Sequence, residues 1–361
     1  MKQLFVDSDI ARAKTISTDF YLKEAYLEAA KEKIFSNSWQ FIGDEDQLVD
    51  ESCALPITLL ENYIHEPLIL VKDGKGKIHC LSNVCTHRGN LLVEQYCTTK
   101  DIRCKYHGRR FKLDGTFSSM PEFNGVEDFP TKDDNLTSLP LHRWGKWLFT
   151  SLNNELQPEK FFEQMIERVG WMPIESFQFR ADLSKDYLVT SNWALYCENY
   201  LEGFHIPFVH PELNSVIDFS NYSIELNELS SLQIGIAKEN ELAFDLPKSS
   251  VDFGKRIGGY YFWVFPNLMF NFYPWGASIN IVQPMGVDKC KVSFRSYVWD
   301  ESKLSAGAGG DIHKVEIQDE DIVQNVQKGI RSRFYKHGRY SVKQEKGTHH
   351  FHRLICDYIN K

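Results

Sequence analysis

The stretch CTH at residues 85–87, followed sixteen residues later by CKYH at residues 104–107, decides how this chain is interpreted. Each half contributes one cysteine and one histidine, and a glycine follows each half, at Gly89 and Gly108. Thiolates and imidazoles are metal ligands, and glycine gives a tight loop the backbone freedom it requires. The two halves therefore predict one metal centre that is held by two loops.

The order of the donors separates two kinds of centre. A zinc site with two cysteines and two histidines usually takes the cysteines from one half and the histidines from the other. Here each half supplies one of each, which indicates a Rieske [2Fe-2S] cluster with Cys85 and Cys104 on one iron and His87 and His107 on the other. Two neutral imidazoles make such a cluster less negative than an all-cysteine cluster, so it accepts an electron more readily.

Length and composition limit the number of domains, the class of partner and the location that we expect. A chain of 361 residues is long for one core, so we expect two domains. The net charge of −8 argues against a nucleic-acid surface, which would be basic. The N-terminus lacks the apolar core of a signal peptide, and no run of 18 apolar residues occurs. We therefore expect a cytoplasmic protein without a membrane segment, and the scattered cysteines outside the motif are typical of reduced thiols.

The residue pattern divides the chain. Residues 20–36 predict a helix with Asp19 as its N-cap, and residues 39–150 predict short strands, including a hairpin from 67–71 and 78–84 and a strand over 144–150. After the polar stretch 151–160, helices near 161–169, 193–204, 319–332 and 352–359 accompany long aromatic strands. We predict an α+β protein: an N-terminal helical segment (1–38) packed on the larger domain, a small all-β domain (39–150) with the cluster, and a larger mixed domain (151–361).

A second metal site is indicated by ENYLEGFHIPFVH at residues 198–210. His205 and His210 are five residues apart, whereas a spacing of four would place them on one helix face. Pro207 should break or restart the helix, so that the second imidazole turns back toward the first. Two histidines and a distant carboxylate form a facial triad on Fe(II), which leaves positions open for water, O2 and substrate. The alternative is two ordinary histidines at a helix end.

The carboxylate should come from IQDEDI at residues 317–322, which we place at the start of a helix. Acidic residues are common at a helix start because they complement the helix dipole, so their presence alone is weak evidence. Asp319 and Asp321 are both candidates.

Together these motifs resemble the α (oxygenase) subunits of Rieske non-haem iron oxygenases, the ring-hydroxylating family. The similarity extends over nearly the whole chain. It includes both cluster loops, the segment 198–210, and the spacing from Asp319 to Gln327-x-Gly329. The tail at residues 338–352, with Tyr261 and Pro266-Asn267, is most similar to the branch with choline monooxygenase and the glycine betaine and carnitine oxygenases.

The resemblance implies roles for individual residues, and a helix-grip, START-like fold for the larger domain. The cluster ligands would be Cys85, His87, Cys104 and His107, and the iron ligands His205, His210 and an aspartate. Counting back eight residues from Gln327 selects Asp319, with Asp321 in reserve. Glu202 matches the acidic bridge between the cluster histidine of one subunit and the iron-bound histidine of the next. Many aromatic-ring dioxygenases carry Asp there, so Glu202 argues against that branch.

The resemblance also implies an activity and partners. The chain would be the terminal oxygenase of an electron-transfer system, a monooxygenase that hydroxylates or demethylates a small quaternary ammonium compound such as choline, glycine betaine or carnitine. It would form a homo-oligomer, a head-to-tail trimer, because the short electron path crosses between subunits. The chain has no Gly-x-Gly-x-x-Gly fingerprint for NAD or flavin. Electrons from NAD(P)H must therefore arrive through a separate flavin and iron–sulfur reductase or a ferredoxin.

Two other functions remain open at this point: an oxygenase of an aromatic ring or aromatic acid, and an electron-transfer protein or binding module with an incomplete iron site. Aromatic faces bind quaternary ammonium groups. Side chains on a strand alternate between faces, and aromatic residues on strands mostly form core, so only some of the aromatics could line a pocket. The candidates are Tyr260, Tyr261, Trp263, Phe265, Phe270, Phe272, Tyr273 and Trp275.

Overall fold

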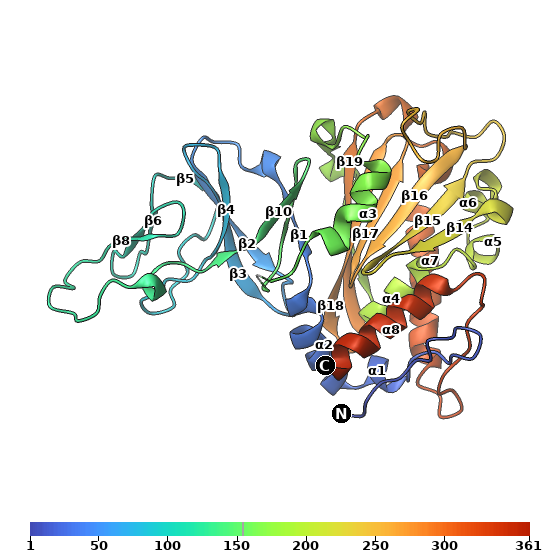
Figure 1. Cartoon of the computed structure of the whole chain (residues 1–361), viewed down its shortest axis with the longest axis horizontal. Helices are drawn as coiled ribbons and strands as arrows, with labels where there is room; N and C mark the ends of the chain where they lie inside the picture. Colours follow the sequence, from blue (N-terminus) through green and yellow to red (C-terminus); the bar gives the residue numbers. More distant parts are fainter. Residues whose placement is uncertain (154) are drawn as a thin grey trace. The chain divides into compact units, whose positions relative to one another are not determined.

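The structure is a computed structural model that describes residues 1–153 and 155–361. The chain forms two compact units, coloured along the sequence in Figure 1, which we describe separately. One unit comprises Met1–Phe35 together with Gln157–Lys361, and the other comprises Ser36–Leu156. The first unit is a mixture of helices and strands and the second is mainly β, which confirms the α+β class. The domain limits at residues 38 and 150 stay a prediction of the sequence.

The smaller unit consists of short antiparallel strands in three sheets, ordered β1-β11-β10, β5-β2-β3-β4-β9 and β6-β7-β8. The strands are β1 (Gln40–Asp44), β2 (Cys53–Leu59), β3 (Glu66–Lys72), β4 (Ile78–Ser82), β5 (Cys97–Thr98), β6 (Ile102–Arg103), β7 (Arg110–Phe111), β8 (Phe117–Ser119), β9 (Ser138–Leu139), β10 (Leu141–Trp144) and β11 (Trp147–Thr150). The predicted hairpin is present as β3 and β4. The single strand predicted over residues 144–150 is wrong, because a tight turn at Gly145 pairs Trp144 with Trp147.

The larger unit is built on one antiparallel sheet of eight strands, ordered β12-β19-β18-β17-β16-β15-β14, with β13 also paired to β19. The strands are β12 (Gln178–Phe179), β13 (Lys185–Val189), β14 (Ser223–Leu226), β15 (Ser230–Ile236), β16 (Ile257–Val264), β17 (Leu268–Tyr273), β18 (Gly276–Gly286) and β19 (Lys289–Val298). Aromatic and β-branched residues make up most of β16, and β16 and β17 are buried along their whole length, as expected for strands that are covered on both faces.

Helices cover both faces of this sheet. They are α1 (Asp19–Leu22), α2 (Glu24–Lys33), α3 (Glu159–Val169), α4 (Trp193–Tyr200), α5 (Ile206–Val209), α6 (Pro211–Val216), α7 (Ile312–Gly329) and α8 (Lys346–Asn360). On β16, the Tyr260 hydroxyl donates to Asp252, which pairs with Arg168 of α3. The Trp263 ring packs against Phe351 of α8 at a centroid distance of 5.1 Å. Since Tyr260 and Trp263 point to opposite faces, α3 lies on one side of the sheet and α8 on the other.

Four of the predicted helices have boundaries that differ from the sequence-based expectation. The helix predicted near residues 193–204 ends at Tyr200. The helix predicted over residues 20–36 is split at Lys23, which is extended (φ −111°, ψ 127°), and Asp19 binds the Lys23 ammonium instead of capping a helix. The helix predicted to begin at Asp319 begins at Ile312, because the Asp311 carboxylate accepts from the N–H of Lys314 at 3.0 Å and caps it there. The last helix also begins six residues earlier than predicted, at Lys346.

The earlier start of α7 changes the position of the acidic segment. Asp319 lies in the middle of the helix, so its neighbours one turn earlier also face the interior of the unit. Val323 and Ile330 are buried as predicted, whereas Ile322 and Val326 are exposed. No helix within the described residues is both long enough and apolar enough to cross a membrane.

Candidate active site and cluster site

The two cluster loops share one pattern of backbone hydrogen bonds. In each loop the cysteine N–H donates to the carbonyl five residues later, at 2.9 Å for Cys85 and 2.8 Å for Cys104. The glycine four residues after each cysteine donates back to the cysteine carbonyl at 3.0 Å in both loops. Gly89 and Gly108 have φ values of +69° and +78°, a conformation that other residues rarely adopt. The two loops are therefore equivalent turns.

The four predicted cluster ligands form two pairs. Cys85 and Cys104 are each 2 % exposed and belong to the same buried cluster of the smaller unit. The rings of His87 and His107 lie 4.9 Å apart, with His87 half-buried and His107 exposed. Burial raises the pKa of the Cys85 thiol, and burial together with the nearby charges of His107 and Arg109 lowers the pKa of His87. Two thiols on one side and two imidazoles on the other fit a cluster with unlike ligands on its two irons.

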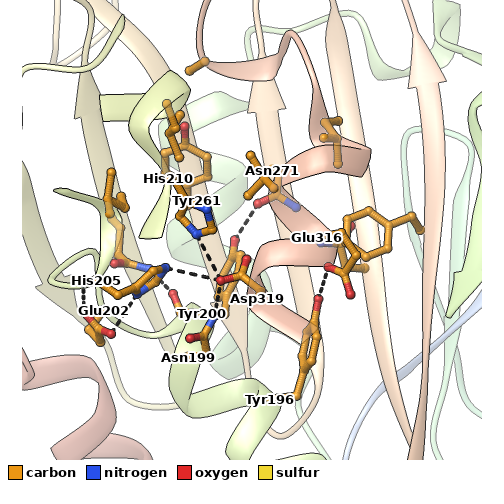
Figure 2. A pocket seen from close by; sticks show the side chains of 18 of the residues that line it. Tyr196, Asn199, Tyr200, Glu202, His205, His210, Tyr261, Asn271, Glu316 and Asp319 are labelled. Carbon is orange, nitrogen blue, oxygen red and sulfur yellow. Dashed lines mark hydrogen bonds and ion pairs between the residues drawn. The ribbon is translucent and has the colours of Figure 1, made fainter. Parts of the chain in front are cut away.

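A second group of side chains that could hold a metal ion lies in the larger unit (Figure 2). His205 lies in the connection after α4, His210 follows α5 directly, and Asp319 comes from α7. One ligand atom from each lies within 4.8 Å of the others. The helix restarts at Ile206 with Pro207 in its first turn, and the two imidazole rings are 5.0 Å apart. The proline therefore turns the chain as predicted.

Hydrogen bonds fix which nitrogen of each imidazole faces the centre of this group. His205 Nδ1 lies 2.8 Å from Glu202 Oε1, and His210 Nδ1 lies 2.7 Å from Gln318 Oε1. Since both partners are acceptors, each Nδ1 carries a proton and each Nε2 presents a lone pair. The two Nε2 atoms lie 3.5 and 3.0 Å from Asp319 Oδ1.

This arrangement fits a cation. Two lone pairs and a carboxylate oxygen at such distances repel one another unless a positive charge lies between them. Without a metal, burial disfavours a charged His210, but Asp319 draws a proton onto His210 Nε2 and raises the pKa of His210, so this position attracts positive charge. Two imidazole nitrogens and one carboxylate oxygen are the donors of an Fe(II) facial triad. The reserve candidate, Asp321, is exposed and lies outside this group.

Two residues beside the triad were not predicted from the sequence. Asn199 donates from Nδ2 to Asp319 Oδ1 at 2.6 Å, and Gln318 accepts from His210. Asn199 lies within the segment 198–210 that indicated the site, so its role could have been suspected there. Nothing in the sequence singled out Gln318, because its contact with His210 depends on which face α7 turns toward the site.

The C-terminal tail contacts helix α4 just before the triad. His352 Nε2 lies 3.0 Å from Glu198 Oε1, and its Nδ1 lies 2.5 Å from the Tyr340 hydroxyl. Tyr21 from the N-terminal segment donates to the same Glu198 oxygen at 2.7 Å. The tail motif therefore holds α4 in place and does not face the metal ligands.

A cavity of about 100 Å³ opens beside the triad. Its aromatic lining consists of Tyr196, Tyr200, Tyr222, Tyr261, Tyr273 and Phe294. Its polar lining beyond the triad includes Asn199, Glu202, Gln233, Asn271, Asn280 and Glu316. Of the eight aromatic candidates, Tyr261 and Tyr273 line this cavity, and Trp263 packs on α8 instead. The other aromatic lining residues come from helices, connections and β19, where no strand pattern singled them out.

Two known families match this chain, one in each part of it. The family described as Ring hydroxylating alpha subunit (catalytic domain) matches residues 175–361, and the family described as Rieske [2Fe-2S] domain matches residues 38–130. The chain belongs to the ring hydroxylating alpha subunit family. It is thus a Rieske oxygenase, an oxidoreductase that incorporates oxygen from O2 into a small-molecule substrate, with a [2Fe-2S] cluster and a mononuclear iron as cofactors.

Individual relatives of this Rieske oxygenase are similar over almost its whole length. It is 27% identical to the chloroplastic choline monooxygenase of Arabidopsis thaliana, over 96% of this chain and 83% of the relative. It is 26% identical to the carnitine monooxygenase oxygenase subunit of Escherichia coli (strain K12), over 95% of this chain and 93% of the relative.

Solved structures share the fold. A quaternary ammonium Rieske monooxygenase, whose structure concerns carnitine oxidation and inter-subunit electron transfer, superposes with a TM-score of 0.75 at 21% identity, over 98% of this chain and 100% of that one. Naphthalene 1,2-dioxygenase from Rhodococcus sp. superposes with a TM-score of 0.71 at 15% identity, over 95% of this chain and 93% of that one. The fold is therefore common to oxygenases of quaternary ammonium and of aromatic substrates.

Proposed function

We propose that this Rieske oxygenase hydroxylates or oxidatively demethylates a small quaternary ammonium compound, in the class of choline, glycine betaine or carnitine. The observation that carries the proposal is the cavity beside the triad, which is lined by five tyrosines and buried polar groups. Aromatic faces attract a trimethylammonium group, which has no N–H to donate. An aromatic hydrocarbon offers no partner to buried amides and carboxylates, and leaving such groups unpaired costs free energy.

The size of the cavity agrees with a small substrate. A water molecule needs about 10–15 Å³ by the same measure, so about 100 Å³ accommodates several water-sized groups. The relatives named for choline and carnitine support the same substrate class, since they align with nearly the whole chain.

We further propose that Cys85, His87, Cys104 and His107 hold the cluster. Two of these ligands are buried thiols and one, His107, is exposed at the surface of its unit. The exposed imidazole would be accessible to a partner, while the buried thiols would keep one iron away from solvent.

In the same proposal His205, His210 and Asp319 hold the mononuclear iron, which supplies the site of O2 activation when bound. The protein's contribution is to orient these ligands. The side-chain oxygens of Glu202 and Gln318 accept hydrogen bonds from the Nδ1–H groups of His205 and His210, so that both Nε2 lone pairs face the iron position. Asn199 steadies the Asp319 carboxylate in the same way.

Electron delivery would involve two kinds of partner. A separate flavin and iron–sulfur reductase or a ferredoxin would bring electrons from NAD(P)H to the cluster. In a head-to-tail homotrimer, the exposed His107 of one subunit would then meet Glu202 of the next, which already bonds His205. A cytoplasmic location remains a prediction of the sequence.

Product analysis with isotope-labelled O2 tests this proposal. The reduced protein is mixed with labelled O2 and with choline, glycine betaine, carnitine or a set of aromatic acids, and the products are identified by mass spectrometry. We expect a labelled hydroxylation product or a demethylated amine from an ammonium compound, and none from the His210→Ala variant. Turnover of the aromatic acids alone would contradict the proposal and favour the aromatic alternative.

A further inference from the structure

One buried carboxyl group in the cavity has no role in holding the metal ligands. Glu316 lies on α7 one helical turn before Asp319, and its side chain lines the same cavity (Figure 2). The residue is 2 % exposed. Its Oε2 accepts from the Tyr196 hydroxyl, whereas its Oε1 has no hydrogen-bond partner among the described residues. Buried polar atoms are nearly always partnered, so an unpartnered carboxylate oxygen in a substrate cavity points to a ligand.

A second unpartnered group lies in the same cavity. The Tyr261 hydroxyl is buried and also has no hydrogen-bond partner among the described residues. The Tyr261 ring packs edge-on against Tyr273 at a centroid distance of 5.9 Å, so the two rings form one aromatic wall. The cavity therefore combines an aromatic wall with a buried carboxyl group.

No positively charged side chain among the described residues that line the cavity is available to pair with Glu316. Among the described residues that line the cavity, none is Lys or Arg, while Glu202, Glu316 and Asp319 are acidic. Glu202 accepts from His205, and Asp319 accepts from Asn199 and faces the two histidines across the proposed iron position. Burial, with the negative charges of Asp319 and Glu320 nearby, raises the pKa of Glu316, as expected for an acid that awaits a counter-charge.

We propose that Glu316 is the specificity residue that selects a cationic substrate, with its carboxylate against the trimethylammonium head and the Tyr261 and Tyr273 rings against the methyl groups. This inference rests on the proposed function and adds to it. A trimethylammonium group spreads its charge over its methyl groups, so it pairs with a carboxylate by electrostatic attraction and needs no N–H donor. The spacing of three residues on one helix places Glu316 beside Asp319, so the bound head lies one helical turn from the iron ligands.

A purely structural Glu316 would behave differently. If the carboxyl served only as the partner of Tyr196, its replacement would weaken the binding of charged and neutral ligands alike. If Glu316 selects a cation, its replacement weakens the binding of the charged ligand and leaves the binding of the neutral ligand unchanged. The test therefore compares each cation with a neutral ligand of the same shape.

Equilibrium binding by calorimetry on the anaerobic, iron-loaded protein makes that comparison. The ligand pairs are choline and glycine betaine, each against the analogue in which a tert-butyl group replaces the trimethylammonium group. Glu316→Gln keeps the size of the side chain and an acceptor for Tyr196 but removes the charge. Glu316→Met is a second charge-free variant for the case in which the first does not fold, and Glu316→Asp keeps the charge on a shorter side chain.

Glu320→Gln is the matched control, because it makes the same change on the same helix but Glu320 does not line the cavity. We expect the wild type and Glu320→Gln to bind the cation of at least one pair more tightly than its neutral analogue. In Glu316→Gln this preference should fall by about tenfold or more, as charge pairs at binding sites contribute, with binding of the neutral analogue preserved. Glu316→Asp should keep part of the preference.

Two results overturn the inference. A preference for the cation that survives in both charge-free variants removes Glu316 from cation recognition but leaves the proposed function in place. A wild-type protein that binds no cation more tightly than its neutral analogue contradicts both the inference and the proposed substrate class.

Discussion

The two proposed metal sites of this chain are built in opposite ways. The predicted cluster ligands come from two turns separated by sixteen residues, and backbone hydrogen bonds of the same pattern shape both turns. The predicted triad comes from segments far apart in the chain, with His210 and Asp319 lying 109 residues apart. There the side chains of Glu202, Gln318 and Asn199 orient the ligands.

This difference has a consequence for substitution. Ligands that are held by backbone geometry change position only if the turn itself changes conformation. Ligands that are held by side chains can be loosened one at a time while the fold persists. The triad should therefore be sensitive to single polar replacements around it, and the cluster loops to replacements of their glycines.

The largest effect should come from the aspartate ligand. Asp319→Ala would remove one of the three proposed iron ligands, so we expect turnover to fall by at least about a thousandfold, because the bound metal supplies several kcal/mol to catalysis. Asp321→Ala, two residues along the same helix, alters an exposed side chain and should leave turnover unchanged. Steady-state assays with iron quantification check the pair. The reverse pattern would assign the third ligand to Asp321.

The next effect concerns Glu202, which would connect the two kinds of site. Glu202→Ala should leave the cluster spectrum and the iron content intact but slow turnover by about 10- to 100-fold, the usual cost of losing a carboxylate behind a metal ligand. Stopped-flow oxidation of the reduced cluster in the presence of substrate measures the step directly. A variant that turns over at the wild-type rate would remove Glu202 from the electron path.

A smaller effect is expected where a side chain only orients a ligand. Gln318→Leu removes the acceptor of the His210 Nδ1 proton, so the affinity for Fe(II) should fall by about 10- to 100-fold while turnover at saturating iron changes less. Gln324→Leu, on the same helix, loses only a bond to the N–H of Thr190 and serves as the control. Equal iron affinities in the two variants would contradict an orienting role for Gln318.

The smallest effect tests the cluster loops. Gly89→Ala should destabilise the cluster unit by about 1–2 kcal/mol, because a left-handed backbone disfavours a Cβ atom by that amount. Space is not the reason, since the added Cβ would have no atom within 4 Å. Gly286→Ala, which also meets no atom but lacks a positive φ, is the control. Thermal loss of the cluster absorbance measures both variants, and equal midpoints would reject backbone geometry as the cause.

The same contrast explains what could be predicted from the sequence. The cluster ligands and the hairpin of β3 and β4 depend on residues close together in the chain, so spacing alone indicated them. The restart of the helix at Ile206 followed from Pro207. The site assignments of His205, His210 and Asp319 remain predictions, although the structure brings the three side chains together.

The cavity could not be predicted in the same way. Glu316 and Gln318 face the site only because α7 begins at Ile312, a start that is set by the Asp311 cap. A helix that began at Asp319 would have left both outside it. Tyr200 and Tyr222 lie outside the strands, so strand periodicity gave no indication of their role.

Iron and acid-labile sulfide counts in two variants test most directly whether the chain holds two independent metal sites. Cys104→Ser should lose the sulfide and the two cluster irons but keep the mononuclear iron. His210→Ala should keep the sulfide and the cluster absorbance and lose only the mononuclear iron. Loss of both kinds of iron together in each folded variant would contradict the account of two separately constructed sites in one chain.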